Sequence, residues 1–169
     1  MRHVRREEPG DGPTIAHVNE EAFGQPDEAR LVDAIRRAGH SMISLVAVDG
    51  ESIVGHILFT PIALDASGSS FTVMGLAPMA VLPEWQRLGI GSMLVEAGLR
   101  ECKAAGCQIV VVIGHPAFYP RFGFRPARAY GLRSEFDVPD EAFMVAELVP
   151  GALANCSGLV RYLPEFGAA

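Results

Sequence analysis

The chain has 169 residues, which is typical of one domain, and 49% of them are hydrophobic while 20% are charged. This balance excludes a disordered chain, and no run approaches the roughly 18 consecutive apolar residues of a membrane span. The net charge is −6 and Lys103 is the only lysine, so the chain lacks the excess of basic residues that is typical of a nucleic-acid-binding protein. The first residues are arginines and glutamates rather than an apolar segment, so we expect no signal peptide and a soluble single domain over residues 1–169.

The three cysteines predict a reducing environment. Cys102, Cys107 and Cys156 are odd in number and form no Cys-x-x-Cys pair, so we expect free thiols in a cytoplasmic protein, without disulfides and without a metal site. A cysteine hydrolase is disfavoured because Cys102 and Cys107 lie within and just after the end of a predicted helix. A reactive thiolate is stabilised at the opposite, N-terminal end of a helix.

The first part of the chain predicts two helices and a hairpin. Asp11-Gly-Pro13 is typical of a helix start, and that helix is expected to run to about Phe23. A second helix is expected to begin near Pro26-Asp27 and to end at Gly39, since its apolar residues share one face. The pattern then changes, and the segments 43–48 and 52–60, joined by Asp49-Gly50, predict a β-hairpin.

The middle of the chain predicts a β-α-β unit. Residues 71–82 predict a strand that Pro78 must interrupt, because proline cannot donate to a ladder. A helix over about 91–105 follows, and the apolar run 108–113 is typical of a strand buried on both faces. A short segment at 116–122 and strands at 142–148 and 158–163 complete an α/β (α+β) sheet of six or seven strands.

The turn between the interrupted strand and the following helix is rich in glycine. Gly89 and Gly91 lie where the helix begins, and such a turn presents unpaired N–H groups to an anion. The turn is not a dinucleotide fingerprint, because Leu94 stands where a third glycine is required, and no Gly-Lys-Ser/Thr of a phosphate loop follows. Taken alone, the two glycines fit an ordinary tight connection equally well.

Two motifs together resemble one family. Gln86-x-x-Gly89-x-Gly91 resembles the Q/R-x-x-G-x-G/A acetyl-CoA loop of the GNAT-type N-acetyltransferases, and Tyr119-Pro-Arg-Phe-Gly-Phe124 resembles the family's Tyr-x-x-x-Gly-Phe. The resemblance covers essentially the whole chain, most closely a compact branch of predicted bacterial acetyltransferases. It implies a mixed sheet splayed between its fourth and fifth strands and flanked by about four helices, in a single N-acetyltransferase domain.

The resemblance also implies a reaction and a cofactor. We expect the acetyl group of acetyl-CoA to pass directly to a primary amine within a ternary complex. Backbone groups of the strand end are expected to bind the pantetheine arm, and the amides of the loop to bind the pyrophosphate. The implied cofactor-binding residues are Met79, Ala80, Val81, Gln86, Arg87, Leu88, Gly89, Ile90, Gly91 and Ser92.

The resemblance implies that Tyr119 is the general acid, which would protonate the leaving thiolate. The general base stays open. Many members use a glutamate on the fourth strand, but residues 71–82 contain no carboxylate. The candidates are Glu20, Glu21, His56, His115 and a water molecule.

An alternative is a non-catalytic acyl-CoA-binding or regulatory module on the same fold. Trp85, Phe118, Phe122 and Phe124 would then form a hydrophobic surface. The presence of Tyr119 favours the enzyme. The acceptor stays open among peptides, antibiotics, polyamines and amino acids, and the resemblance also allows a homodimer.

Overall fold

The computed structural model describes residues 1–65 and 72–167, and these divide into two compact units. The first unit comprises residues 1–59, residues 77–98 and the C-terminal segment from Pro164. The second comprises residues 60–76 and 99–163. Strands β3 and β4 and helix α3 each contribute residues to both units.

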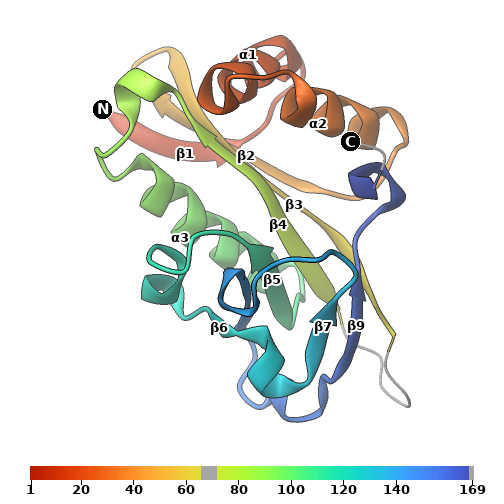
Figure 1. Ribbon diagram of the computed structural model, residues 1–169. Coiled ribbons are helices and arrows are strands. Elements are labelled where there is room, and N and C mark those ends of the chain that lie inside the picture. The colour runs from red at the N-terminus through yellow and green to blue at the C-terminus, as the bar shows by residue number, and fades with distance from the viewer. Residues whose placement is uncertain (66–71, 168–169) are drawn as a thin grey trace. The chain divides into compact units, whose positions relative to one another are not determined.

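The described residues form three α-helices and nine strands in a mixed sheet (Figure 1). The helices are α1 (Gly12–Phe23), α2 (Asp27–Arg37) and α3 (Ile90–Ala104). The strands are β1 (Arg2–Arg6), β2 (Ile43–Asp49), β3 (Ser52–Asp65), β4 (Val73–Val81), β5 (Ile109–Ile113), β6 (Arg125–Pro126), β7 (Leu132–Ser134), β8 (Phe143–Glu147) and β9 (Gly158–Arg161). The strand order is β1-β2-β3-β4-β5-β8-β6, and β9 pairs with β3 and β7.

The expected α/β class is confirmed, while the element counts need correction. The sheet has nine strands rather than six or seven, because β1 and the very short β6 and β7 carry no clear alternation of apolar residues. The described residues hold three α-helices rather than about four. The short segment expected at 116–122 contains a 3₁₀ turn, Tyr119–Phe122.

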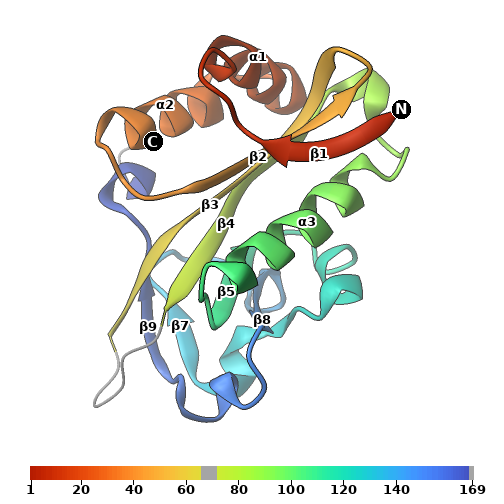
Figure 2. The same ribbon diagram turned by 180° about the vertical axis from the view of Figure 1, so that it is seen from behind.

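In the first unit, helices cover both faces of an antiparallel sheet formed by β1, β2 and the first part of β3 (Figures 1 and 2). Adjacent residues of β3 point to opposite faces. A Cβ atom at Gly55 would lie 3.0 Å from the Leu94 side chain, so the first part of α3 packs closely on that face. His56 points to the other face, where its ring contacts Asn19 of α1.

Strand β1 was not expected from the sequence. Arginines occupy three of its five positions and no residue in it is fully buried, so the pattern resembles a solvated segment. Its backbone nevertheless pairs antiparallel with β2, from Arg2 opposite Asp49 to Arg6 opposite Leu45. Charged side chains are common on edge strands, because they discourage pairing with other molecules.

In the second unit, β5 pairs with β4 on one side and β8 on the other. The β4–β5 pairing is parallel and runs from Val73 opposite Ile109 to Leu76 opposite Val112. Both strands are described throughout, and their ladder ends there, two residues before Pro78. This agrees with the expectation that the strands part near the proline; Phe71, the expected first residue of the strand, lies outside the described residues.

Close packing inside the first unit gives a stability prediction at Gly98. A Cβ atom there would lie 2.3 Å from the ring of Phe59, which is fully buried. We therefore expect Gly98→Ala to lower the free energy of unfolding by about 1–3 kcal/mol, as overpacking typically does. Denaturant unfolding measures this. The double variant Gly98→Ala/Phe59→Leu should lose less than the two single variants combined, and strict additivity would contradict the packing argument.

Candidate active site

The glycine-rich loop lies in the first unit, between the end of β4 and the start of α3. A 3₁₀ turn at Pro83–Trp85 follows the strand, and the backbone then becomes left-handed at Arg87, with φ of 64°, and at Gly89, with φ of 84°. Glycine adopts such a φ without strain, whereas an L-residue such as arginine does so at a cost. The loop therefore has the shape that the sequence predicts for a close approach of backbone to a ligand.

Helix α3 begins with amide groups suited to an anion. The Met93 amide donates a 3.1 Å hydrogen bond to the carbonyl oxygen of Gly89, the residue just before α3. The preceding amides of Ile90, Gly91 and Ser92 have no partner within the helix, as in any first turn. The first turn contains no acidic residue. The positive end of the helix dipole is thus left without a neutralising carboxylate of its own.

Gln86 links the loop to the strand. Its side-chain Nε2 donates a 2.9 Å hydrogen bond to the carbonyl oxygen of Val81. The Ala80 and Val81 side chains are buried and that of Met79 is half-buried, so this strand end can offer a ligand chiefly its backbone. In the described structure the motif's glutamine thus positions the loop against the strand.

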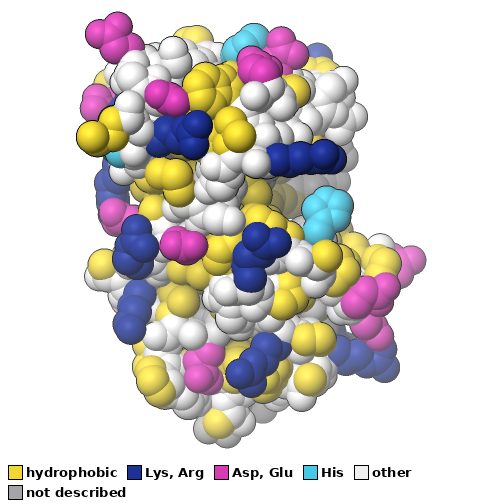
Figure 3. Space-filling view, turned by 90° about the vertical axis from the view of Figure 1, so that its left-hand side faces the viewer, with side chains coloured by type: hydrophobic (Ala, Val, Ile, Leu, Met, Phe, Trp, Pro, Cys, Tyr) yellow, Lys and Arg dark blue, Asp and Glu magenta, His cyan; other side chains and the backbone are white. Residues whose placement is uncertain are grey.

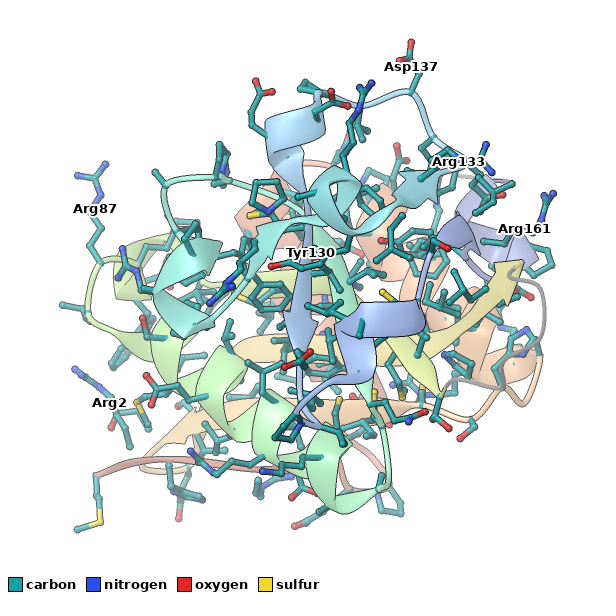
Figure 4. The ribbon with its side chains drawn as sticks, turned by 90° about the horizontal axis from the view of Figure 1, so that it is seen from below. Arg2, Arg87, Tyr130, Arg133, Asp137 and Arg161 are labelled. Carbon is teal, nitrogen blue, oxygen red and sulfur yellow. The ribbon has the colours of Figure 1, made fainter. Side chains whose placement is uncertain are left out.

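Arg2 contacts the loop from β1, which the sequence did not predict. Its Nη1 donates to the Leu88 carbonyl oxygen at 3.5 Å, and its guanidinium lies 5.8 Å from the centre of the Trp85 ring. Asp49 accepts from its Nε at 3.3 Å. Arg87, by contrast, points outward from the loop (Figure 4). No motif could have indicated Arg2, because its role depends on the unexpected strand.

Tyr119 lies in the second unit, at the start of the turn after β5. Its ring fits against Gly114, where a Cβ atom would lie 2.4 Å from the ring, and packs edge-on against Phe118 and Phe124. Only 6% of the residue is exposed, and burial raises the pKa of its phenol to about 12. The hydroxyl makes no hydrogen bond to any described residue, so its proton is available to a ligand.

Three of the four side chains considered as a base are exposed. Glu20 and Glu21 lie on the surface at the end of α1, in the first unit. His115 is exposed in the second unit, and its carbonyl oxygen accepts a 3.3 Å hydrogen bond from the Tyr119 amide. His115 is therefore the one candidate base that shares a turn with Tyr119.

His56 is fully buried, and both of its ring nitrogens are occupied. Asn19 Nδ2, which also donates to the Ile15 carbonyl, lies 3.2 Å from Nδ1, so that nitrogen accepts. Nε2 therefore carries the proton and donates to Ser44 Oγ at 3.0 Å. Ser44 in turn donates to Glu7, which Arg36 contacts at 2.6 Å. Burial, with a smaller effect of the Arg36 charge, lowers the pKa of His56 to about 3.

This buried histidine predicts a loss of stability in acid. Because its pKa is about 3 in the folded protein and about 6.5 when unfolded, folding favours the neutral ring. Its stabilising contribution is complete above pH 6.5 and is lost as the pH falls toward 3. The slope should approach about 1.4 kcal/mol per pH unit within that window. Unfolding of His56→Asn, measured across the window, should be less pH-dependent than that of the wild type. His17→Asn, at an exposed position on α1, is the control, and equal slopes in all three proteins would contradict the assignment.

Three further features concern membranes, surface charge and metals. None of the helices within residues 1–65 and 72–167 is long and apolar enough to cross a membrane. Basic and acidic side chains are interspersed on the face shown in Figure 3. All three cysteines are buried and free. In the same described ranges, no three His, Cys, Asp or Glu side chains gather as metal ligands.

Three features together define an N-acetyltransferase fold. They are the glycine-rich loop before α3, the parallel β4–β5 pair that stops before Pro78, and the turn that carries Tyr119. Residues 3–127 match the model of the acetyltransferase (GNAT) domain, and the chain belongs to this family.

The relatives extend the likeness over nearly the whole chain. The uncharacterized N-acetyltransferase YhbS of Escherichia coli K12 is 35% identical over 164 residues, which are 96% of this chain and 97% of the relative. The crystal structure of E. coli YhbS in complex with CoA superimposes with a TM-score of 0.92 and 34% identity, over 98% of this chain and 92% of the other. A GNAT family acetyltransferase from Brucella melitensis in complex with acetyl-CoA gives 0.81 and 32%, over 98% of both chains.

These findings confirm the expected family, the enzyme class and the cofactor class. Both of these structures contain the cofactor, as CoA in one and acetyl-CoA in the other. The roles of individual residues stay predictions, as does the acceptor.

Proposed function

We propose that this protein transfers the acetyl group of acetyl-CoA directly to a primary amine in a ternary complex. The observation that carries the proposal is the loop of the first unit, where left-handed Arg87 and Gly89 precede a helix whose first turn has free amides and no carboxylate. The amides from Arg87 to Ser92 would bind the pyrophosphate. The backbone of Met79, Ala80 and Val81 would pair with the amides of pantetheine, as an added strand does.

The reaction needs three proton movements. The acceptor's ammonium must lose a proton before its nitrogen attacks the thioester carbon, because an amine with a pKa near 10.4 is mostly protonated at pH 7. The C–N bond then forms, and the attacking nitrogen, now positively charged, loses a second proton to the base or to water. The tetrahedral intermediate breaks its C–S bond, and the thiolate of CoA takes up a proton. We assign that last proton to Tyr119, whose hydroxyl is protonated at neutral pH and makes no other hydrogen bond within the described chain.

His56 is the weakest candidate for the base. Both of its nitrogens are engaged, and a group with a pKa of about 3 accepts a proton poorly at neutral pH. Glu20, Glu21, His115 and water remain, and His115 is favoured among the side chains by its place in the Tyr119 turn. The proposed chemistry involves no nucleic acid or membrane. Three free thiols support a cytoplasmic location.

The test is release of free CoA thiol from acetyl-CoA, with and without an amine. The amines are a lysine-containing peptide, spermidine, an aminoglycoside and a free amino acid. An acetyltransferase releases thiol only when a suitable amine is present, and the acetylated amine appears in equal amount. Release without any amine would indicate a thioesterase. Tight binding of acetyl-CoA with no release for any amine would favour the alternative, a non-catalytic acyl-CoA-binding module.

A further inference from the structure

A pocket lies within the second unit, and its lining contains none of the residues proposed to bind acetyl-CoA. Its volume is about 490 Å³, within the range of small-molecule sites. Three polar side chains line it, from β6, from the 3₁₀ turn Ala127–Tyr130 and from the end of β8: Arg125, Tyr130 and Glu147. From this pocket we infer that the protein binds a free amino acid, with its carboxylate on Arg125 and Tyr130 and its ammonium on Glu147.

The pocket holds opposite charges that do not touch. Arg125 pairs across the sheet with Val145, so Glu147 is its diagonal neighbour, two residues further along β8. Diagonal neighbours on a sheet are within reach of long side chains. Among the described residues, however, no ion pair joins the two. Arg125 Nη1 instead lies 3.3 Å from Tyr130 Oη, and Glu147 Oε2 accepts from the Leu153 amide at 3.0 Å. Both side chains line the same pocket of about 490 Å³, so a charged ligand bound there would lie beside each of them.

The unused hydrogen-bonding groups match a zwitterion. A guanidinium has five N–H donors, and Arg125 uses one of them on Tyr130. Because the Tyr130 oxygen accepts that bond, its own proton can be donated, and the two side chains together suit a carboxylate. Glu147 keeps its second oxygen as an acceptor, which suits an ammonium group. A ligand with only one of these charges would leave the other side of the pocket unpaired.

The walls of the pocket leave room for a side chain. Gly123 and Gly151 line it, and a Cβ atom built at either would meet nothing within 4 Å. Leu153 and Ala154 add apolar surface. The Tyr130 side chain is half-buried. These features favour an amino acid with an apolar side chain, and L-leucine is a suitable probe.

The test is calorimetric titration of the full chain with L-leucine, without acetyl-CoA. We expect saturable binding. N-acetyl-L-leucine, which lacks the ammonium, and L-leucinamide, which lacks the carboxylate, should each bind at least tenfold more weakly. No saturable binding of leucine, or equal binding of the three compounds, would overturn the inference.

Variants then assign the contacts. Arg125→Gln should weaken the binding of leucine at least tenfold but leave the binding of leucinamide unchanged. Glu147→Gln should weaken the binding of leucine but leave the binding of N-acetyl-leucine unchanged. Arg128→Gln is the matched control, since Arg128 is an exposed arginine outside this pocket, paired with Asp140. An equal loss in the control would also overturn the inference. CoA titrated into the same proteins tests the proposed function separately, because its binding should not depend on Arg125 or Glu147.

Discussion

Gly91→Val is expected to weaken CoA binding at least about 100-fold, or roughly 2.8 kcal/mol, while the protein stays folded. Gly91 is the second residue of α3, in the turn whose free amides are proposed to contact the pyrophosphate. A valine there would place a branched side chain where the phosphate must approach the backbone. Its φ is not among the left-handed values of the chain, so the backbone conformation there is one that an L-residue adopts without strain. Calorimetric titration with CoA measures the effect.

The control for this variant lies on the same helix. Glu96→Val puts the same β-branched residue at an exposed position of α3, so it tests the general effect of a valine in this helix without touching the loop. It should bind CoA like the wild type. A folded Gly91→Val protein with unchanged CoA affinity would show that the loop does not bind the pyrophosphate.

Tyr119→Phe is expected to lower kcat at least tenfold and to change the KM for acetyl-CoA little. General-acid help of this kind is typically worth about 10²–10⁴-fold, or roughly 3–5 kcal/mol of the barrier. The substitution removes one hydroxyl that bonds to no described residue, and it keeps the ring packing against Gly114, Phe118 and Phe124. Stability should therefore change little, which separates a chemical role from a structural one.

The pH profile gives an independent reading of the same residue. With a pKa of about 12, the phenol stays protonated through the ordinary assay range, so it should cause no loss of rate between pH 7 and about 10. Steady-state rates with a true acceptor measure both effects. A folded Tyr119→Phe protein that turns over at the wild-type rate would exclude Tyr119 as the acid.

Much of the fold followed from the sequence, because long apolar patterns and turn residues act locally. The three helices, the hairpin joining β2 and β3, and strand β5 lie close to their expected bounds. Pro78 correctly indicated where the β4–β5 ladder would stop. Strand β1 was missed because it is held by backbone pairing with β2, while its own side chains are mostly charged. Strands as short as β6 leave no periodic pattern to detect.

The candidate site was only partly predictable for a related reason. The cofactor residues form one continuous segment, so a motif can indicate them. Arg2 contacts that segment from β1, which is far away in the sequence, so no local sequence pattern links Arg2 to the loop. His56 appeared as a candidate base because a sequence does not show burial. Its hydrogen bonds to Asn19 and Ser44 come from two other elements.

The hydrogen bond from Gln86 to Val81 has a consequence for the energetics of binding. It closes a ring over residues 81–86, so the chain between the strand end and the loop has lost much of its conformational freedom before any ligand arrives. A flexible loop must spend part of the interaction energy on becoming ordered, whereas a preorganised one does not. The Leu82 amide, which donates to the Val54 carbonyl at 2.9 Å within the same ring, fixes it further to β3. The loop thus has reduced conformational freedom before any ligand binds, and the side chain of the motif's glutamine supplies one of the bonds that restrict it.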